Sequence, residues 1–244
     1  MSVLAVVPVR MDAKRFPGKP LADLDGRPLV EWVYEAATRC PHFDEVVVAT
    51  DSEEIAARVR GFGGAVELTR GDHSTGTDRV AEVAERHPEA EVVVNVQGDQ
   101  PFASPEMLKA LVEPFRSDEP AAMSTLACPF SDPGLAADPN VIKVVLDLHG
   151  YALYFSRSPI PHSADGARGY HHLGLYAFGR QALLDFTALE PTPLERLERL
   201  EQLRALEHGM RIRVGLVEEP VLEVNTPEDL ERARGQVAAV RAER

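Results

Sequence analysis

The 244-residue sequence has only two cysteines, few aromatic residues and no long apolar run. Cys40 and Cys128 do not form a CxxC spacing, so the sequence indicates no disulfide framework, and we expect a reducing, cytoplasmic location. No segment reaches the roughly 20 apolar residues that a membrane-spanning helix needs. The apolar start at residues 1–9 is too short for a signal peptide. We therefore expect a cytoplasmic protein without a membrane partner.

Positively charged residues are outnumbered by negatively charged ones. The sequence has 26 Lys and Arg residues against 39 Asp and Glu, a net charge of −13, which argues against nucleic acid as the main partner. The phosphate-binding patterns GxxxxGK[ST] and GxGxxG are absent, and so is the nucleophile pattern GxSxG. A covalent enzyme intermediate is therefore not indicated, whereas a small anionic ligand held by local cations is compatible with the composition.

Buried strands and helices alternate through the first half of the chain. Apolar runs predict strands at residues 3–9, 45–49, 65–68 and 91–96. Helical spacing predicts helices at residues 29–39, 52–59, 77–86 and 104–115, two of them capped by Ser52 and Ser104. This order predicts an α/β fold with a Rossmann-like, mostly parallel sheet flanked by helices.

The second half of the sequence has a different pattern. Strands are expected at residues 141–147, 152–156, 174–178 and 211–217, and an amphipathic helix at 194–208. The last helix is expected to begin at Thr226, because Pro227 follows and Asp229 completes a capping box. We expect one domain over residues 1–244. An antiparallel excursion at roughly 130–190 would form a lid, an acceptor wall or a dimer surface.

Cations are concentrated just after the first expected strand. Arg10, Arg15 and Lys19 lie on one loop, in which Gly18 allows a phosphate to approach the backbone closely. In so acidic a chain, this loop indicates a polyphosphate site, in which the cations would stabilise the charge of a departing pyrophosphate. The alternative is a solvated surface loop.

Two further loops carry ligand-binding chemistry. Gln97-Gly98-Asp99 follows a buried strand, where a carboxylate can hold Mg²⁺ against substrate phosphates; alternatively, Asp99 caps a turn. The loop at residues 70–79 is rich in glycine and hydroxyl residues and precedes a helix. It can bind an anion or read a nucleobase edge, or it can be an ordinary capped helix start.

The remaining candidates are weaker by themselves. His171 and His172 point to opposite faces of a strand, so a zinc site is not expected, whereas His172 and Tyr176 could hydrogen-bond a polyhydroxylated substrate. Core or surface roles are equally compatible with these two residues. Asn225 could be a turn residue or a ligand, and alone it is weak evidence.

Long motifs extend through nearly the whole chain. They are PVR…RFPGKPL at 8–21, VVVATD at 46–51, TRGDHSTGTDR at 69–79, NVQGDQP at 95–101, NVIKVVLDLHGYALYFSR at 140–157, HLGLYAF at 172–178, PLERLERLEQLR at 193–204 and VNTPEDL at 224–230. Together they resemble the 3-deoxy-manno-octulosonate cytidylyltransferases (CMP-Kdo synthetases) of the sugar nucleotidyltransferase superfamily. The resemblance implies the nucleotide-diphospho-sugar transferase fold.

The resemblance also implies an activity. CTP and a 2-keto-3-deoxy sugar acid, Kdo, would give the CMP-sugar and pyrophosphate by in-line attack of the anomeric hydroxyl on the α-phosphate, with Mg²⁺ as cofactor. The family forms homodimers, and its product serves lipopolysaccharide biosynthesis.

By position, the resemblance assigns a role to each candidate residue. Catalytic residues would be Arg10, Lys19 and Asp99. Nucleotide-binding residues would be Pro8, Arg10, Arg15, Lys19, Arg70, Ser74, Gly76, Thr77 and Asp99. The sugar acid would contact Gln97, Arg157, His172, Tyr176, Glu201 and Gln202. The metal would be held by Asp99 and Asn225.

This sequence departs from the family pattern at several places. Asn225 stands where the family usually has Asp, and Ala13 and Lys14 replace hydroxyl residues of the first loop. The segment between Arg157 and His172 is shorter than usual, and it would border the sugar pocket. Alternative functions are therefore the same reaction on amino-Kdo, a sialic-type acid or a phosphonate, or nucleotide binding without turnover.

Overall fold

The chain divides into two compact units, which are described separately. The computed structural model describes residues 1–12, 15–117, 119–130, 132–162 and 169–242, so Ala13 and Lys14 lie outside the described residues. Unit 1 contains Met1, Glu91–Val94 and Glu106–Pro220, and therefore the whole predicted 130–190 excursion. Unit 2 contains Ser2–Ala90, Asn95–Pro105 and the chain from Val221 onward.

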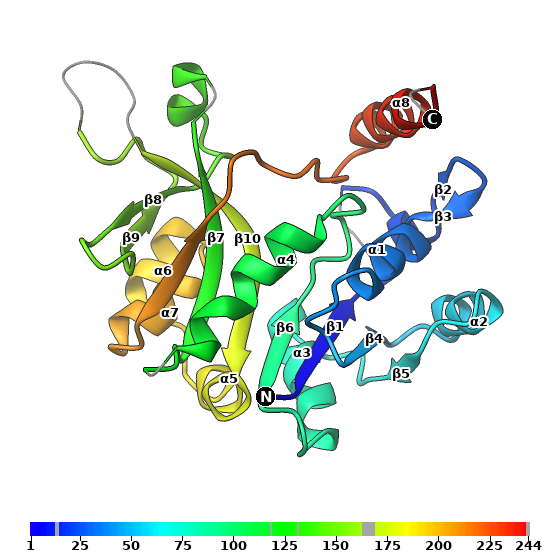
Figure 1. Ribbon diagram of the computed structural model, residues 1–244, viewed down its shortest axis with the longest axis horizontal. Helices are drawn as coiled ribbons and strands as arrows, with labels where there is room; N and C mark the ends of the chain where they lie inside the picture. Colours follow the sequence, from blue (N-terminus) through cyan, green and yellow to red (C-terminus); the bar gives the residue numbers. More distant parts are fainter. Residues whose placement is uncertain (13–14, 118, 131, 163–168, 243–244) are drawn as a thin grey trace. The chain divides into compact units, whose positions relative to one another are not determined.

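Unit 2 has the parallel βα pattern that the sequence predicts (Figure 1). Its strands β1 (Val3–Pro8), β4 (Glu45–Thr50) and β5 (Val66–Leu68) pair in parallel, with β4 in the middle. Its helices are α1 (Leu29–Thr38), α2 (Glu53–Gly61), α3 (Gly76–Arg86) and α8 (Pro227–Ala242). The apolar run of β1 is continuous because α1 and α3 both pack against this strand.

Side-chain caps fix where three helices of unit 2 begin. Ser52 accepts a hydrogen bond from the backbone N–H of Ile55, which confirms the predicted cap of α2. The capping box of α8 is also confirmed, because Thr226 and Asp229 exchange hydrogen bonds of 3.3 and 2.8 Å. α3 begins one residue earlier than predicted, since its cap is Thr75.

The strand ends of unit 2 lead into the candidate site. After β1 the chain forms the 3₁₀ helix η1 (Lys19–Leu21) and a two-stranded antiparallel hairpin, β2 (Asp23–Leu24) and β3 (Arg27–Pro28), neither of which the sequence predicted. Strand β6 (Val92–Asn95) contributes to both units. Beyond its end, the N–H of Val96 donates to the carbonyl of Val6 at 2.9 Å, which places the following loop beside the end of β1.

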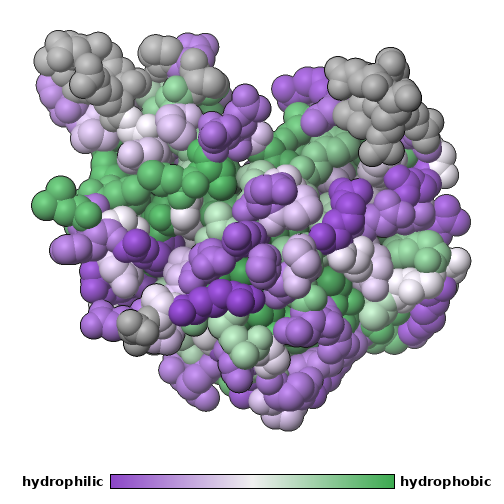
Figure 2. Space-filling model, in the orientation of Figure 1, coloured by the Kyte–Doolittle hydropathy of each residue, from purple (hydrophilic) through white to green (hydrophobic). Residues whose placement is uncertain are grey.

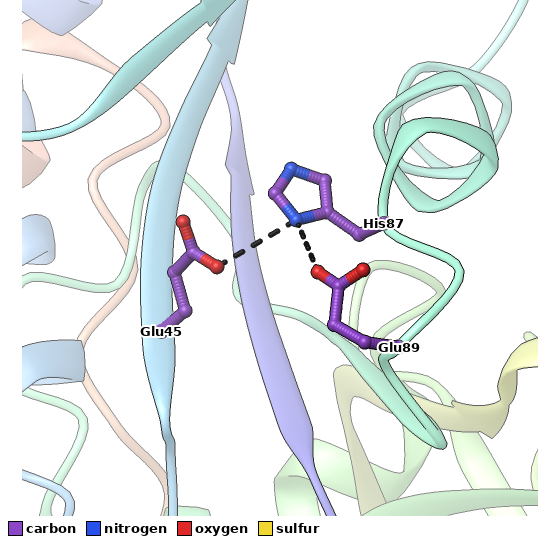
Figure 3. A group of neighbouring side chains, drawn as sticks. All are labelled: Glu45, His87 and Glu89. Atoms are coloured by element: carbon purple, nitrogen blue, oxygen red, sulfur yellow. Dashed lines mark hydrogen bonds and ion pairs between the residues drawn. The ribbon is translucent and has the colours of Figure 1, made fainter.

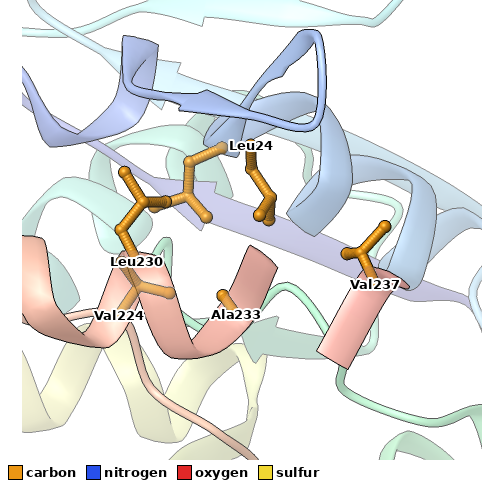
Figure 4. Packing of buried hydrophobic residues seen from close by; sticks show 6 residues of the cluster. Leu24, Val224, Leu230, Ala233 and Val237 are labelled. Carbon is orange, nitrogen blue, oxygen red and sulfur yellow. The ribbon is translucent and has the colours of Figure 1, made fainter. Parts of the chain in front are cut away.

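A hydrophobic cluster anchors the last helix within unit 2. Leu24 from the hairpin packs with Val224 and with Leu230, Ala233 and Val237 of α8, whose side chains point toward the hairpin in Figure 4. Val224 and Leu24 are fully buried, so this packing also fixes the short segment at residues 223–225 that precedes α8.

Unit 1 contains the antiparallel part of the sheet. Its helices are α4 (Pro105–Val112), η2 (Glu113–Arg116), η3 (Pro133–Ala137), α5 (Arg180–Thr187), α6 (Pro193–Glu198) and α7 (Gln202–Glu207). Its strands are β7 (Met123–Pro129), β8 (Lys143–Leu146), β9 (Ala152–Ser156), β10 (Tyr170–Gly179) and β11 (Ile212–Leu216). β10 pairs antiparallel with β7 and β8, β8 pairs antiparallel with β9, and β11 pairs in parallel with β7. The predicted antiparallel excursion is therefore confirmed.

Several predicted elements of the second half need correction. The single helix predicted at 194–208 is wrong: the chain forms α6 and α7, because Arg199 adopts a left-handed conformation with φ of 55° and ends α6. The helix predicted at 104–115 ends at Val112 and continues as η2, since Pro114 has no N–H to donate. Strand β7 and helix α5 were missed.

Among the described helices, none combines the length and the apolar character that crossing a bilayer requires.

Candidate active site

The loop after β1 carries the cations that the sequence singled out. Arg10 follows the buried Val9 and is exposed, and so is Arg15. Gly18 adopts φ of 73°, a conformation that few residues other than glycine accept, and its N–H donates to the carbonyl of Met11 at 3.0 Å. This turn places Lys19 at the start of η1. The loop therefore returns on itself and keeps its cations at the carboxyl end of β1.

Two of these cations pair with the predicted metal-binding oxygens, all within unit 2. The ammonium of Lys19 lies 3.0 Å from Oδ2 of Asp99. The guanidinium of Arg15 donates to Oδ1 of Asn225 at 2.9 Å. The N–H of Val224 donates to the carbonyl of Asp99 at 2.8 Å, so the chain segments that carry Asp99 and Asn225 lie side by side. The structure thus brings together four candidates that are up to 210 residues apart in sequence.

Gly98 allows this close arrangement. A Cβ atom at this position would lie 2.5 Å from Cγ1 of Val9 and 3.0 Å from the carbonyl oxygen of Pro8. Both distances are shorter than normal van der Waals contact, so glycine is required here for its size. The absent side chain lets the loop of Asp99 lie directly against the end of β1.

Glu223 belongs to the same group, and the sequence analysis missed it. Its carboxylate accepts one hydrogen bond from Nε2 of Gln100 at 3.2 Å and one from Nδ2 of Asn225 at 3.0 Å. Partial burial and the charge of Asp99 raise the pKa of Glu223, while these amides and the ammonium of Lys19 oppose the rise. No local motif marks Glu223, because its role depends on the loop of Asp99.

The predicted nucleotide loop lies at the start of α3. The hydroxyl of the buried Thr77 accepts a hydrogen bond from Nδ2 of Asn95 at 3.3 Å, and Asn95 in turn accepts one from Gln97 at 3.4 Å. Ser74 and Gly76 are exposed at the end of the same loop. Thr77 and Gln97 are thus linked through one buried amide, although the resemblance assigns them to different substrates.

Arg70, another predicted nucleotide-binding residue, contacts a carboxylate of α3. Its Nε donates to Glu82 at 3.4 Å, and its side chain is 69% exposed. Burial opposes ionisation of Glu82, but hydrogen bonds from His73 and from the N–H of Arg70 outweigh it and lower the pKa of this carboxyl. The guanidinium of Arg70 is therefore held beside a charged carboxylate. Its assignment to the nucleotide stays a prediction.

His172, in unit 1, is a buried and neutral histidine. Its Nε2 lies 2.9 Å from the hydroxyl of Thr125, and that hydroxyl donates to the carbonyl of Leu175 at 2.7 Å. Because the hydroxyl has a single proton, it accepts from His172, which must carry its proton on Nε2. Burial and the neighbouring His171 lower the pKa of His172 to about 3. Its Nδ1 is therefore a hydrogen-bond acceptor at neutral pH.

Tyr176, Glu201 and Gln202 also belong to the predicted acceptor set, and all three lie in unit 1. The rings of Tyr176 and His172 lie 5.5 Å apart, and burial together with the charge of Glu201 raises the pKa of Tyr176 well above its ordinary value. Gln202 is only 3% exposed, and its Nε2 has no hydrogen-bond partner in the described part of the chain. Tyr176 and Gln202 can therefore each donate a hydrogen bond to a ligand.

Arg157 is largely occupied within unit 1. Its guanidinium donates to the backbone carbonyls of Pro139, Glu198 and Arg199, at 2.8, 2.8 and 3.4 Å. Lys143, which the sequence analysis missed, is fully buried, and its ammonium donates to the carbonyls of Asp138 and Val141. These cations fix the loops around β8 and β9, so the assignment of Arg157 to the sugar acid stays a prediction.

Comparisons with known proteins identify the family. A family model described as Cytidylyltransferase matches residues 4–212. The chain is 55% identical to a 3-deoxy-manno-octulosonate cytidylyltransferase of Acaryochloris marina, with 96% of each chain covered. It is 49% identical to the enzyme of the same name from Synechococcus elongatus, over 95% of this chain and 96% of that one. This chain belongs to the cytidylyltransferase family.

Solved structures support the same family and fold. The model superimposes on a CMP:2-keto-3-deoxy-manno-octonic acid synthetase complexed with CTP, with a TM-score of 0.94, 38% identity and coverage of 98% of this chain and 99% of that one. A 4-diphosphocytidyl-2C-methyl-D-erythritol synthase from Anaerococcus prevotii, 16% identical, shares the fold with a TM-score of 0.66, over 97% of this chain and 98% of that one. The predicted fold, family and nucleotidyltransferase class of this cytidylyltransferase are therefore confirmed.

A separate polar group of the cytidylyltransferase lies away from the strand ends that carry these candidates. Nδ1 of His87 lies 3.0 Å from Glu89 and 3.6 Å from Glu45, the first residue of β4 (Figure 3). Its Nε2 lies 2.5 Å from Glu67. Burial opposes protonation of this imidazole, but the hydrogen bonds to Glu67 and Glu89 outweigh it and raise the pKa of His87. These contacts are an ion-pair network at the start of the strand.

Proposed function

We propose that this cytidylyltransferase couples CTP to a 2-keto-3-deoxy sugar acid, specifically Kdo, and releases the CMP-sugar and pyrophosphate. One observation carries the proposal: the loop cations Lys19 and Arg15 pair with the oxygens of Asp99 and Asn225 at the strand ends of unit 2. The names of the relatives indicate which nucleotide and which acid such a site would receive. The anomeric hydroxyl of the acid would attack the α-phosphate in line, without a covalent enzyme.

The phosphates would be held by Arg10, Arg15 and Lys19. Arg10 is exposed beside a buried strand end, and each of the other two would exchange a protein oxygen for a phosphate oxygen. As negative charge builds on the departing pyrophosphate, these cations stabilise it. The nucleoside would contact Pro8, Arg70, Ser74, Gly76 and Thr77, of which Arg70 and Ser74 lie on the loop before α3 and Gly76 and Thr77 in its first turn.

Asp99 and Asn225 fit a divalent cation, and we propose Mg²⁺. Both offer oxygen atoms, the donors that Mg²⁺ prefers, and the ammonium of Lys19 already occupies a cation position at Asp99. When bound, the ion would neutralise phosphate charge and lower the pKa of the attacking hydroxyl. Asp99 and Asn225 would hold it, and Lys19 would move from Asp99 to a phosphate oxygen.

The sugar acid would contact Gln97 of unit 2 and the following residues of unit 1: Arg157, His172, Tyr176, Glu201 and Gln202. His172 would accept a hydrogen bond from a sugar hydroxyl at Nδ1, since its own proton is on Nε2. Tyr176 and Gln202 would donate to acceptor oxygens. These contacts position the attacking hydroxyl, and positioning supplies much of the rate in such transfers.

We also propose that the segment at roughly 130–190 contributes an acceptor wall and the contact of a cytoplasmic homodimer. Figure 2 shows hydrophobic side chains gathered over β8 and β9, and Leu148 in the turn between these strands and Leu153 of β9 are 102% and 61% exposed. Exposed apolar surface of this kind is typical of a protein interface. Light scattering of the Leu148→Glu variant should show a monomer if this surface joins two copies.

Pyrophosphate release from CTP and Mg²⁺ tests the function. We expect release with Kdo and less with amino-Kdo, a sialic-type acid or a phosphonate. The Asp99→Ala variant should lose at least about 2–4 kcal/mol of transition-state stabilisation, roughly 30- to 1000-fold in rate. The exposed Asp185 on α5 provides a matched control as Asp185→Ala, which should keep the normal rate. A near-normal rate for Asp99→Ala, or CTP binding without release on any acid, would contradict the proposal.

A further inference from the structure

The proposed metal pair contains one carboxylate and one uncharged amide. Asp99 brings a negative charge, whereas Asn225 brings only a carbonyl oxygen. An amide also has two faces of opposite character, because its NH₂ group repels a cation and its oxygen attracts one. A cation site that includes Asn225 therefore needs a group that determines which face points inward.

Glu223 is bonded to this amide. Oε2 of Glu223 accepts a hydrogen bond of 3.0 Å from Nδ2 of Asn225. Oδ1 of Asn225 is thereby left for the opposite side, where the positively charged Arg15 donates to it at 2.9 Å. The amide of Asn225 thus already presents its oxygen to a cationic group and its NH₂ to a carboxylate.

Glu223 is linked to the loop of Asp99 as well. Oε1 of Glu223 accepts a hydrogen bond of 3.2 Å from Nε2 of Gln100, the residue that follows Asp99. The backbone hydrogen bond from the N–H of Val224 to the carbonyl of Asp99 connects the same two chain segments. One carboxylate therefore contacts a neighbour of the first proposed ligand and the side chain of the second.

We infer that Glu223 is a positioning residue for the divalent cation. It holds the oxygen of Asn225 toward the ion and supplies the second negative charge that the amide lacks. This inference rests on the proposed function, since it assumes that Asp99 and Asn225 hold a metal. Groups that orient metal ligands through a hydrogen bond typically change metal affinity by about 10- to 100-fold when removed.

Binding of Mn²⁺ to the full chain, followed by the electron paramagnetic resonance signal of the free ion, tests the inference without a turnover assay. The Glu223→Gln variant should bind Mn²⁺ about 10- to 100-fold more weakly than the wild type. The Glu228→Gln variant is the matched control, because Glu228 is exposed on the first turn of α8, and it should bind like the wild type.

A double-mutant cycle separates positioning from a structural role. In the Asn225→Asp background both faces of residue 225 are oxygen and the second charge lies on the residue itself, so Glu223→Gln should then change Mn²⁺ affinity by no more than a few-fold. Normal Mn²⁺ binding by Glu223→Gln, or an equal loss in both backgrounds, would overturn the inference. A lower free energy of unfolding in urea together with normal Mn²⁺ binding would also overturn it, because Glu223 would then only stabilise the loop.

The same titrations distinguish failure of the inference from failure of the proposed function. If the wild type binds Mn²⁺ and Asp99→Asn abolishes binding, the metal site stands, and only the result for Glu223→Gln decides its role. If the wild type and Asp99→Asn bind Mn²⁺ equally weakly, the metal site itself is refuted and the inference with it.

Discussion

Replacing Gly98 by alanine tests how closely the metal loop packs against the end of β1. The added Cβ atom would overlap Cγ1 of Val9 at 2.5 Å and the carbonyl of Pro8 at 3.0 Å. Val9 cannot easily move away: it is buried, its β-branched side chain has few rotamers, and its N–H donates to the carbonyl of Ala49 at 2.9 Å. The chain just before Gly98 is fixed as well, because the N–H of Val96 donates to the carbonyl of Val6.

The expected magnitude follows from two opposing effects. Inserting a methyl group into a well-packed site costs about 1–3 kcal/mol. The same change makes the unfolded chain less flexible, which returns about 0.4–1 kcal/mol. Overlap prevails, and we expect a net loss of roughly 1–2 kcal/mol. For a chain of this size that is a fall of about 2–8 °C in the unfolding temperature.

Activity should fall further than stability alone explains. The overlap can be relieved only by moving the Asp99 loop away from Pro8 and Arg10, and displacement of a positioned group by about 1 Å can cost about 10²-fold in rate. Calorimetry and pyrophosphate release on the same preparation measure the two effects. The Gly61→Ala variant is the control, because its Cβ meets nothing within 4 Å, and it should be neutral or stabilising. An unchanged unfolding temperature and rate for Gly98→Ala would refute the packing argument.

Three further predictions concern other parts of the chain. His87→Gln should destabilise the protein more at pH 6 than at pH 8.5, because the raised pKa makes the ion pairs complete below about pH 6.5 and lost as the pH rises through the folded-state value; equal changes in urea midpoint would contradict this. Cys128 should not react with a disulfide reagent at pH 8 in the native protein, since burial raises its pKa to about 11, and a rate equal to that of the unfolded chain would contradict this. Arg199→Gly should raise stability by about 1 kcal/mol, because Arg199 has φ of 55°. In thermal unfolding, the same change at Arg196, inside α6, should lower stability by a similar amount.

The strands and cations of unit 2 could be predicted from the sequence because local signals determine them. A continuous apolar run such as β1 has to be buried on both faces, and a glycine and charges just after it mark the ligand end of a parallel strand. Ser52 and Thr226 occupy helix starts that depend on a few neighbouring residues. Lys19 and Asp99 therefore meet at the strand ends, where the sequence predicted both.

The elements of unit 1 were harder to predict because tertiary contacts determine them. β7 contains Ser124 and Thr125, which are fully buried and would interrupt an apolar pattern, yet their hydroxyls donate to the carbonyls of Leu111 and Leu175. The break between α6 and α7 could not be predicted, because the residue with the left-handed conformation is Arg199 and not a glycine. Glu223 was missed for the same reason, since its partner Gln100 is 123 residues away in sequence.

In the proposed function, the polar groups of unit 1 would select the acceptor. His172 is neutral with an acceptor at Nδ1, Tyr176 keeps its proton, and Gln202 has an unpartnered NH₂ group in the described part of the chain. In the proposed function, these three side chains would recognise hydroxyl and carbonyl groups rather than charge. An acid that lacks a matching hydroxyl would leave a buried polar atom unpaired, a penalty that can reach about 10⁴-fold in specificity. The pattern of hydroxyl groups on the acid, more than its carboxylate, should therefore decide which sugar acid this unit accepts.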